Sequence, residues 1–354
     1  MKKKVLLAMS GGIDSSMAAV MLINEGYEVA GITMKLWNFI EDGGLINDRE
    51  IEKTKFLAEK YNIPLKIVDV RKDFEREVVN YFVEEYITGY TPNPCVMCNP
   101  KIKWGMLWKA FDENFDYYAT GHYAIIGNEK GRFFVKQAKD KFKDQSYFLW
   151  RLSQKQLSKT LFPLGSITKT EIKKKAEKEG FVSLSKQKES QEICFLAGKD
   201  YREFLLKKIP NIYDNIGKGD FIWVQTGEKV GEHNGFFNFT IGQRRGLNIA
   251  LGKPVYVVSI DAKQNIVYLG EEKDLYSKEM IVGKINFQKY EMISDGMEVF
   301  TKIRYRSKGY TSKLFMLGED KIKVIFDVPV RAITPGQSAV FYEHDDVVGG
   351  GIIE

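Results

Sequence analysis

Residues 5–16 read VLLAMSGGIDSS, an apolar run that leads directly into a turn of serine and glycine. The run Val5–Met9 predicts a buried strand, and a helix is expected from about Ser15 to Glu25, ending at Gly26. Two glycines let the backbone approach an anion closely, and amide groups at a helix N-terminus point toward it. This strand, turn and helix therefore predict a phosphate-binding loop.

The turn differs from the loop of P-loop kinases and ATPases. Those proteins carry Lys followed by Ser or Thr after the last glycine, whereas Ile13 and Asp14 follow Gly12 here. An ordinary tight turn with a serine helix cap would explain the hydroxyl groups but not the whole string. We therefore expect Ser10 and Ser15 to donate to phosphates, and Asp14 to orient magnesium or the phosphates.

The composition fits a protein of the cytosol. The chain has 354 residues, a net charge of +6 and 44% hydrophobic residues, which is enough for roughly two or three domains. No stretch approaches the roughly 18 consecutive apolar residues of a membrane span. Three lysines and then only five apolar residues precede Ser10, too few for a secretion signal. The modest positive charge permits a polyanionic partner without requiring one.

The first half of the chain alternates predicted strands with predicted helices. Apolar runs at Val29–Thr33, Leu65–Val70 and Tyr117–Thr120 indicate further strands, with helical periodicity between them. Such alternation predicts an α/β domain with a parallel sheet. From Gly217 onward, short apolar runs separated by Gly, Asn and Asp predict β structure, and the last series fits a small antiparallel barrel or sandwich. We expect three domains, at residues 1–205, 206–278 and 279–354.

Cysteine is sparse in this chain. Cys95 and Cys98 lie in TPNPCVMCN, residues 91–99, and Cys194 follows about a hundred residues later. A small, odd number of cysteines in a reducing compartment indicates metal binding or thiol chemistry rather than disulfides. A helix is expected to begin near Lys101, so its terminus, together with Lys101 and Lys103, should lower a thiol pKa and favour the thiolate.

Three interpretations of the cysteines remain open from the residues. Three cysteines and a distant histidine would complete the four ligands of a structural zinc site, and Cys194 between Ile193 and Phe195 would fit an inert core residue. In the third interpretation, one cysteine carries a persulfide sulfur and a second thiol releases it by disulfide exchange. A variant of the third uses Cys95, Cys98 and Cys194 as ligands of an iron–sulfur cluster with one iron open for hydrosulfide.

Several strings together resemble one known family over the whole length of the chain. The segment SGGIDS resembles the pyrophosphate loop of ATP pyrophosphatases, where the two outer phosphates of ATP leave together. The full set is similar to the bacterial tRNA-specific 2-thiouridylases and follows that family's order: MSGGIDSS, TPNPCVMCN, ATGHYA, KDQSYFLW, EICF, TIGQRRGL, IRYRS and TPGQSAVFY. The resemblance implies a PP-loop ATP pyrophosphatase domain, a small central β-containing domain that contacts tRNA, and a C-terminal antiparallel β-barrel.

The resemblance also implies the reaction and its participants. The expected enzyme is an ATP-dependent sulfurtransferase of the cytoplasm that adenylates the C2 oxygen of the wobble uridine and then delivers sulfur. Its products would be 2-thiouridine, AMP and pyrophosphate. ATP and Mg²⁺ are the expected cofactors, with an iron–sulfur cluster as the alternative to a persulfide. The expected partners are tRNA and a sulfur-donor protein or sulfide, with neither a membrane nor DNA.

Matching positions carry the family's site residues onto this chain. Cys98 is the expected nucleophile and Cys194 the expected persulfide carrier, and the two would close a disulfide after sulfur transfer. The nucleotide is expected at Ala8, Met9, Ser10, Gly11, Gly12, Ile13, Asp14, Ser15, Met34 and Gly121. The tRNA is expected at Asn93, Pro94, Cys95, His122, Lys143, Asp144, Gln145, Arg304, Tyr305 and Gln337.

One position departs from the family's pattern. Many members have Asp, a proposed acid or base, where this chain has Cys95. Either a neighbouring group or water then moves the proton, or this cysteine is a cluster ligand, and we favour the persulfide scheme. Two rival functions use the same loop. A synthetase that adenylates and then adds nitrogen has no use for paired thiols, and the intact loop argues against a tRNA-binding scaffold with a vestigial site.

Overall fold

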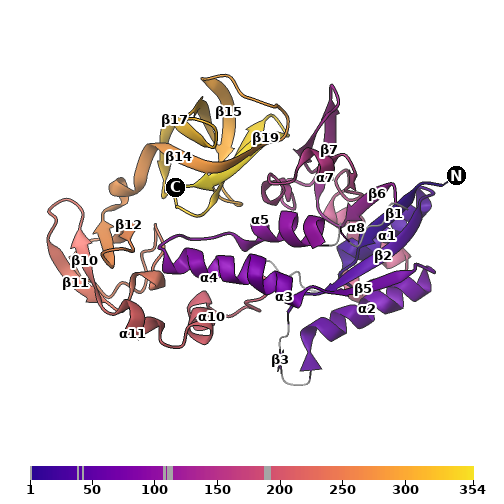
Figure 1. Cartoon of the computed structure of the whole chain (residues 1–354), viewed down its shortest axis with the longest axis horizontal. Helices are drawn as coiled ribbons and strands as arrows, with labels where there is room; N and C mark the ends of the chain where they lie inside the picture. The colour runs from indigo at the N-terminus through magenta and orange to yellow at the C-terminus, as the bar shows by residue number, and fades with distance from the viewer. Residues whose placement is uncertain (1, 38–39, 42–43, 107–108, 110–114, 187–192) are drawn as a thin grey trace.

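The computed structural model describes residues 2–37, 40–41, 44–106, 109, 115–186 and 193–354. Figure 1 shows three parts: an α/β domain at the N-terminus, a smaller β-rich part, and a barrel at the C-terminus. The parallel and antiparallel sheets confirm the fold class expected from the sequence. Within the described ranges, every helix is too short or too polar to cross a membrane.

The N-terminal domain is built on a parallel sheet with the strand order β5-β2-β1-β6-β9. Its strands are β1 (Lys4–Ala8), β2 (Glu28–Lys35), β5 (Leu65–Asp69), β6 (Tyr117–Thr120) and β9 (Thr160–Leu161). The first four confirm the strands predicted from apolar runs. Strands of such a sheet are apolar on both faces because both are covered, and Leu6 and Leu7 accordingly enter two different cores.

Helices cover one face of this sheet. They are α1 (Ile13–Asn24), α2 (Ile46–Lys60), α8 (Lys169–Lys178) and α9 (Val182–Ser185), with the short strands β3 (Ile40–Glu41) and β4 (Gly44–Leu45) before α2. Met17 of α1, Leu57 of α2 and Ile172 of α8 share one core with Leu7. This packing brings the first turns of α1 and α8 together, which matters for the phosphate loop.

The segment with the first two cysteines adjoins the sheet. It consists of α3 (Arg71–Phe74), the π-helix η1 (Glu75–Val79), α4 (Asn80–Ile87), α5 (Pro94–Cys98) and the π-helix η2 (Asn99–Met106). Trp104 of η2 packs in one core with Leu6 and Tyr118, and its Nε1 donates to Thr160 Oγ1 at 2.8 Å. These contacts fix the helices that carry the cysteines against the strands.

The central part combines two helices with a small sheet of order β11-β10-β13-β12. Its elements are α10 (Tyr201–Lys208), α11 (Ile212–Ile216), β10 (Gly219–Trp223), β11 (Lys229–His233), η4 (Phe236–Asn238), β12 (Tyr256–Asp261), β13 (Ile266–Gly270) and η5 (Glu272–Leu275). Tyr201 stacks on Tyr86 of α4 with ring centroids 4.3 Å apart. The core of the central part therefore continues into the cysteine-bearing helices.

The C-terminal part is an antiparallel barrel. Its strands follow the order β14-β17-β16-β15-β18-β19, and pairing between β14 and β19 closes the ring. They are β14 (Tyr276–Phe287), β15 (Met297–Lys302), β16 (Tyr310–Met316), β17 (Lys321–Arg331), β18 (Ser338–Glu343) and β19 (Asp346–Ile353). Closure leaves the barrel with few unpaired strand edges, as a stable small barrel requires.

A hairpin from the N-terminal domain extends the barrel sheet. The strands β7 (Ala124–Glu129) and β8 (Arg132–Gln137) pair with each other, and Lys136 of β8 pairs with Asp346 of β19. The short helices η3 (Ser146–Phe148) and α7 (Gln154–Leu157) follow the hairpin. This junction is not apparent from the sequence, because no residue pattern in the hairpin identifies the strand with which it pairs.

Gln288 holds the same junction from the barrel side. Its side chain is fully buried, and its Nε2 donates to the carbonyl oxygens of Leu149 at 2.8 Å and Trp150 at 3.0 Å. Its Oε1 accepts from the backbone N–H of Val135 at 3.1 Å. One amide side chain thus bonds the hairpin and the following helical turn to the barrel.

The expected domain limits near residues 205 and 278 fall inside α10 and β14. Each of these elements packs or pairs as one unit. We therefore propose that the chain passes from one part to the next a few residues earlier, before Tyr201 and before Tyr276.

Candidate active site

The phosphate loop joins the end of β1 to the start of α1. The hydroxyl of Ser15 accepts from the N–H of Ser10 at 3.1 Å and donates to the carbonyl oxygen of Gly12 at 3.1 Å, which closes the turn. Gly12 stands at the N-cap of α1, and no side chain caps the helix there. The amide groups at this helix N-terminus are therefore available to an anion.

The two glycines of the turn are needed for different reasons. Gly11 has φ +73°, and a Cβ there would lie 2.5 Å from the carbonyl oxygen of Glu50, so the fold itself excludes any other residue. At Gly12 φ is negative and a Cβ would meet only Ser10 Oγ, at 3.7 Å. The protein does not fill the space beside Gly12, as expected for a surface that receives a ligand.

The end of β6 lies directly against the loop. A Cβ on Gly121 would come within 2.9 Å of Ser15 N and 3.0 Å of the carbonyl carbon of Asp14, so only glycine allows this approach. Strands β1 and β6 are paired through Ala8 and Thr120, which brings their carboxyl ends to one edge of the sheet. Such an edge is where open α/β sheets bind ligands.

The remaining expected nucleotide residues lie around this edge. Met9 is buried behind the turn, and its N–H donates to the carbonyl oxygen of Ile32 at 2.8 Å. Met34 lies near the end of β2, partly buried, and packs against the core that contains Cys98. The fold thus brings the expected adenine contact and an expected catalytic cysteine into one cluster.

The first two cysteines lie on α5. Asn93 is its N-cap and accepts from the N–H of Cys95 at 3.2 Å, and Pro94 occupies the first turn. Cys98 is buried in the same core as Phe195 and Leu196, which directly follow Cys194. Cys194 itself is exposed as a residue. The fold therefore brings the Cys194 segment beside Cys98, although 95 residues separate them in the sequence.

The structure corrects the expected ionisation of the thiols. Burial raises the pKa of Cys98 to about 12 and that of Cys194 to about 11, and it also raises the pKa of Cys95. Lys103 lowers all three pKa values, as expected, but burial outweighs it. Cys194 is exposed when the accessible surface of the whole residue is considered. Its pKa is nevertheless raised, because the pKa responds to the protein atoms packed around the sulfur.

The position of the helix explains part of this correction. The helix begins at Pro94 and not near Lys101, so Cys98 lies at the end of α5, away from its positive terminus. Lys101 extends toward Glu77, with its Nζ 3.8 Å from the carboxylate. Only Lys103 remains to favour the thiolate electrostatically, and the thiols also raise one another's pKa.

His122 links Lys103 to the sheet. Its Nδ1 lies 2.7 Å from Thr120 Oγ1 and its Nε2 lies 3.2 Å from Lys103 Nζ. Burial, reinforced by Lys103, lowers the pKa of His122 well below its ordinary value, so the ring is neutral at pH 7. A neutral ring that accepts from Lys103 through Nε2 donates to Thr120 through Nδ1. His122 thereby orients the cation that faces the thiols.

The expected tRNA residues of the barrel also reach the cysteine loop. Gln337 Nε2 donates to the carbonyl oxygen of Thr91 at 2.7 Å, two residues before Asn93. Tyr305 packs on Phe148 with ring centroids 4.5 Å apart, and Phe148 accepts at its carbonyl from Asn99 Nδ2 at 2.9 Å. Arg304, in contrast, is held on the barrel, where its Nη2 donates to the carbonyl oxygen of Ala332 at 2.6 Å.

The segment Lys143–Gln145 lies next to the phosphate loop. Gln145 Oε1 accepts from the N–H of Tyr123 at 3.0 Å, and the hydroxyl of Tyr123 donates to Asp14 at 2.7 Å. Asp144 is buried and accepts from the N–H of Ala138 at 2.9 Å and from Ser146 Oγ at 2.7 Å. Asp144 thus holds the loop, while Lys143 and Gln145 are only half-buried.

The His, Cys, Asp and Glu side chains determine which metal ions the protein could hold. Within the residues described, no group of three or more His, Cys, Asp or Glu side chains is placed so that it could hold a metal ion. The three cysteines therefore do not form a site for a single metal ion such as zinc, although their thiols lie near enough to raise one another's pKa. Mg²⁺ needs fewer protein ligands, because it binds largely through the phosphates of its nucleotide.

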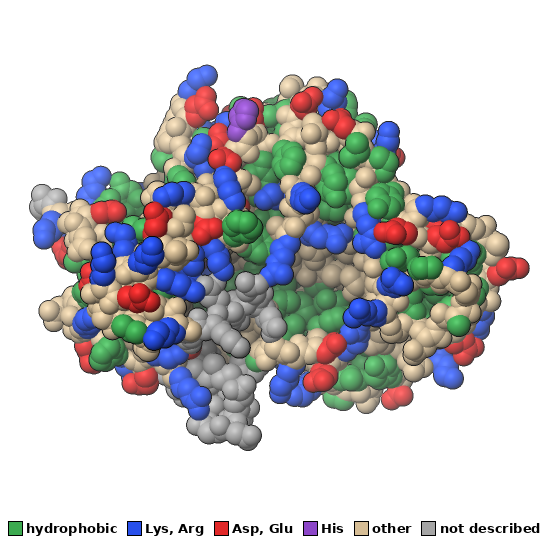
Figure 2. All heavy atoms as spheres, turned by 180° about the vertical axis from the view of Figure 1, so that it is seen from behind, with side chains coloured by type: hydrophobic (Ala, Val, Ile, Leu, Met, Phe, Trp, Pro, Cys, Tyr) green, Lys and Arg blue, Asp and Glu red, His purple; other side chains and the backbone are tan. Residues whose placement is uncertain are grey.

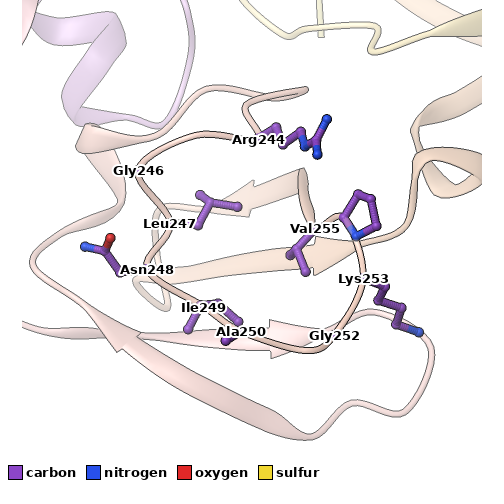
Figure 3. A pocket seen from close by; sticks show the side chains of 10 residues that line it. Arg244, Gly246, Leu247, Asn248, Ile249, Ala250, Gly252, Lys253 and Val255 are labelled. Atoms are coloured by element: carbon purple, nitrogen blue, oxygen red, sulfur yellow. The ribbon is translucent and has the colours of Figure 1, made fainter.

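The surface around the site is basic. Figure 2 shows Lys and Arg side chains around a hollow in the middle of one face, beneath the barrel. A separate open pocket of about 610 Å³ belongs to the central part alone and is lined by Arg244, Gly246, Leu247, Asn248, Ile249, Ala250, Gly252, Lys253, Pro254 and Val255 (Figure 3). None of the expected nucleotide residues lines this pocket. The glycine turn, and not this pocket, is therefore the candidate phosphate site.

Two residues of the site were missed from the sequence: Tyr123 and Lys169. Lys169 Nζ lies 2.6 Å from Asp14 Oδ1 and 2.8 Å from Oδ2. It belongs to a stretch whose lysines look like an ordinary solvated helix face. One signal was available, since a lysine in the first turn of a helix is unfavourable beside the positive end of the helix dipole.

A parallel sheet whose first strand leads into SGGIDS, and whose neighbouring strand packs Met34 against the core that contains Cys98, defines a PP-loop nucleotide-binding domain equipped for sulfur chemistry. Three family profiles match the chain: a tRNA methyl transferase HUP domain at residues 3–198, a tRNA methyl transferase PRC-barrel domain at 202–271, and an aminomethyltransferase β-barrel domain at 277–353.

Curated relatives match over the full length. A tRNA-specific 2-thiouridylase MnmA of Cytophaga hutchinsonii is 44% identical, covering 100% of this chain and 98% of the relative. One of Amoebophilus asiaticus is 45% identical, covering 100% and 96%. The chain belongs to the MnmA family of tRNA-specific 2-thiouridylases. Among solved structures, a 4-thiouridine synthetase in complex with RNA and ATP is 20% identical, covers 59% of this chain and 51% of that one, and has a TM-score of 0.39.

Proposed function

We propose that this protein is an ATP-dependent sulfurtransferase that converts the wobble uridine of tRNA to 2-thiouridine. The observation that carries the proposal is the core that Met34 shares with Cys98 and the Cys194 segment, because Met34 lies on the strand that pairs with β1 at the edge where the open phosphate loop begins. Membership in the MnmA family supports the same reaction. Cytoplasmic tRNA is the substrate, and its phosphates would meet the basic face around the hollow.

The first step activates the base. Oxygen on a pyrimidine ring leaves poorly, so the C2 oxygen of the uridine attacks the α-phosphorus of ATP and the α–β bond breaks. Pyrophosphate leaves into the turn formed by Ser10, Gly11 and Gly12, whose amides and hydroxyls offset its charge. Mg²⁺ held through the ATP phosphates at the turn of Ser10, Gly11 and Gly12 would neutralise part of their charge. The target base must leave its stack to reach this position.

The second step transfers sulfur. The terminal sulfur of a persulfide on Cys194 attacks C2, and AMP leaves with the former base oxygen. Cys98 then attacks the inner sulfur of Cys194, which breaks the S–S bond to the base, leaves the 2-thiocarbonyl and forms the Cys98–Cys194 disulfide. A dithiol reductant supplies two electrons and two protons to reopen it. The exposure of Cys194 suits its loading by a donor protein that carries a persulfide, because the outer sulfur passes to Cys194 and the donor keeps a thiol. Sulfide loads it only by attacking Cys194 in the Cys98–Cys194 disulfide, which forms the persulfide and releases Cys98 as the thiol.

Two features of the site shape this scheme. Cys95 replaces the carboxylate of many relatives, and its raised pKa prevents it from acting as a base at neutral pH, so we propose that water takes the proton. The thiol of Cys98 also needs a proton acceptor, because burial keeps it protonated. Lys103 is the cation that faces the resulting thiolate. The scheme routes no step through an iron–sulfur cluster, for which Cys95, Cys98 and Cys194 would be the ligands.

The test measures two products from one incubation of enzyme, tRNA, ATP and sulfide. We expect pyrophosphate release that depends on tRNA and 2-thiouridine detected by nucleoside mass spectrometry. Cys98→Ser and Cys194→Ser should each abolish 2-thiouridine while leaving the first pyrophosphate release intact, because adenylation uses no thiol. Cys95→Ser is the matched control and should retain product.

Several outcomes would overturn the proposal. Formation of 2-thiouridine by Cys98→Ser or Cys194→Ser would exclude the thiol scheme. A nitrogen-substituted nucleoside in place of 2-thiouridine, formed equally by both variants, would favour a nitrogen-adding synthetase. Methyl transfer from S-adenosylmethionine in place of thiolation would favour the reaction named in the matching domain descriptions. Iron and sulfide in anaerobically purified, active enzyme would replace the persulfide with a cluster.

A further inference from the structure

Buried Lys169 forms an ion pair at the phosphate loop with Asp14, whose side chain is 35% exposed. Lys169 is only 6% exposed, and its Nζ lies within 2.8 Å of both carboxylate oxygens of Asp14. The hydroxyl of Tyr123 donates to Oδ1 of the same carboxylate at 2.7 Å, and the Tyr123 ring lies 5.7 Å from the ammonium group. The loop is therefore completed by a cation 155 residues further along the chain.

The surroundings fix the backbone of Lys169. It is the first residue of α8, where Thr168 and Glu171 form a capping box, and its own N–H donates to Asp140 Oδ2 at 2.9 Å. A cation at the positive end of a helix dipole and out of water is unfavourable by itself. The carboxylate of Asp14 explains this position of Lys169, because the two opposite charges offset each other.

Asp14 poses an electrostatic problem for a loop that binds phosphates. It lies in the first turn of α1, directly after the glycines whose amides face the anion. An uncompensated carboxylate there would repel the outer phosphates of ATP, because like charges a few ångströms apart oppose each other strongly when water is partly excluded. The ion pair with Lys169 removes this repulsion and keeps the carboxylate in one orientation.

We propose that Lys169 is a positioning residue of the nucleotide site, which neutralises Asp14 so that the phosphate loop accepts the polyphosphate of ATP. The inference rests on the proposed function only in its use of ATP, and nothing in it depends on tRNA or on the thiols. It extends the nucleotide site from the first loop of the chain to the start of α8. Because both oxygens of Asp14 are engaged by Lys169, Asp14 acts mainly through this pair and not as a free metal ligand.

The experiment compares Lys169→Met, Asp14→Asn and the double variant with the wild-type protein. Equilibrium dialysis with labelled ATP measures binding, and thermal unfolding shows that each variant is folded. Lys169→Met should weaken ATP binding by about tenfold or more, because the carboxylate is then uncompensated. The double variant should bind ATP more tightly than Lys169→Met, because removing the carboxylate removes the repulsion. Lys169→Arg should retain most of the affinity.

Lys174→Met is the matched control, because Lys174 is exposed on the same helix. It should bind ATP like the wild type. The inference is overturned if Lys169→Met binds ATP within twofold of wild type, or if the folded double variant binds no better than Lys169→Met. Dialysis requires no turnover, so an enzyme that binds ATP yet forms no 2-thiouridine would refute the proposed reaction and leave this result interpretable.

Discussion

Cys98 and Cys194 face opposite requirements, since each must be shielded from water for sulfur transfer yet ionise to react. Shielding dominates in the structure, where burial raises the pKa of Cys98 to about 12 and that of Cys194 to about 11. Both are acids that are neutral when protonated, so at pH 7 both remain thiols. A resting enzyme with protonated thiols resists oxidation, because the thiolate is the reactive form.

The pH dependence of thiol alkylation tests this. With iodoacetamide, the rates for Cys98 and Cys194 should rise about tenfold per pH unit from pH 7 to 10 without levelling, whereas an ordinary thiol levels above about pH 8.5. Cys98 should react more slowly than Cys194 because its pKa is higher. Peptide mass spectrometry of Cys98→Ser and Cys194→Ser separates the two sites. A plateau below pH 9 for Cys98 would contradict the raised pKa.

At the scale of residues, the sequence predicts only the site residues that are close together along the chain. Ser10, Gly12, Asp14 and Ser15 are identified by spacing, because a strand, a turn and a helix follow one another without a gap. Lys169 completes the same loop from 155 residues away, and its place in the first turn of the helix is the one local sign that sets it apart from the other lysines there. The sign of the thiol pKa shift depends on burial, which a sequence does not specify.

At the scale of elements, the stability of α5 depends on its N-cap residue. Asn93 caps the helix that carries both cysteines of the loop and is also an expected tRNA contact. Asn93→Ala should lower the free energy of unfolding by about 1 kcal/mol, the usual effect of losing a cap. Urea unfolding measures this loss.

Asn93→Ser separates the two roles of this residue. Serine is a good cap, so this variant should unfold like the wild type. If Asn93 also contacts the target base, Asn93→Ser should still raise the KM for tRNA while leaving the KM for ATP unchanged. An unchanged KM for tRNA in the stable serine variant would limit Asn93 to capping.

The strands of the parallel sheet were predictable because strands covered on both faces are continuously apolar. The start of the cysteine helix was not recognised, although Asn93 followed by Pro94 is a typical pair of N-cap and first-turn residues. Taken alone, Pro92 and Pro94 suggest a rigid loop, and Lys101 and Lys103 suggest that the helix begins only after it. Tertiary contacts then determined which thiol lay at which end of the helix.

At the scale of the whole molecule, Gln288 joins the barrel to the N-terminal domain. Replacing it with leucine would leave the N–H of Val135 without its partner, whereas the carbonyl oxygen of Leu149 would still accept from the N–H of Leu152 at 3.1 Å. One such buried loss costs about 1–3 kcal/mol, so Gln288→Leu should lower the free energy of unfolding by about 2 kcal/mol in urea. Gln264→Leu, at an exposed turn, is the control and should change it little. A loss below about 1 kcal/mol would show that water replaces the amide.

The barrel was predictable as a class, from short apolar runs separated by turns, but its connection to the hairpin was not. Lys136 and Asp346 pair across 210 residues, and both are charged residues that would suit any exposed edge. Register between such distant strands is set by the surrounding cores and by Gln288, not by the strands themselves.

The junction between β8 and β19 also has a consequence during protein synthesis. The partner of β8 is the last strand described, and it emerges from the ribosome 210 residues later. At typical rates of synthesis the hairpin waits roughly 10–40 s with one open edge. Other nascent chains on the same message can pair with that edge during the delay. A chain that ended at His344 would lack β19 and would leave this edge of the hairpin permanently open.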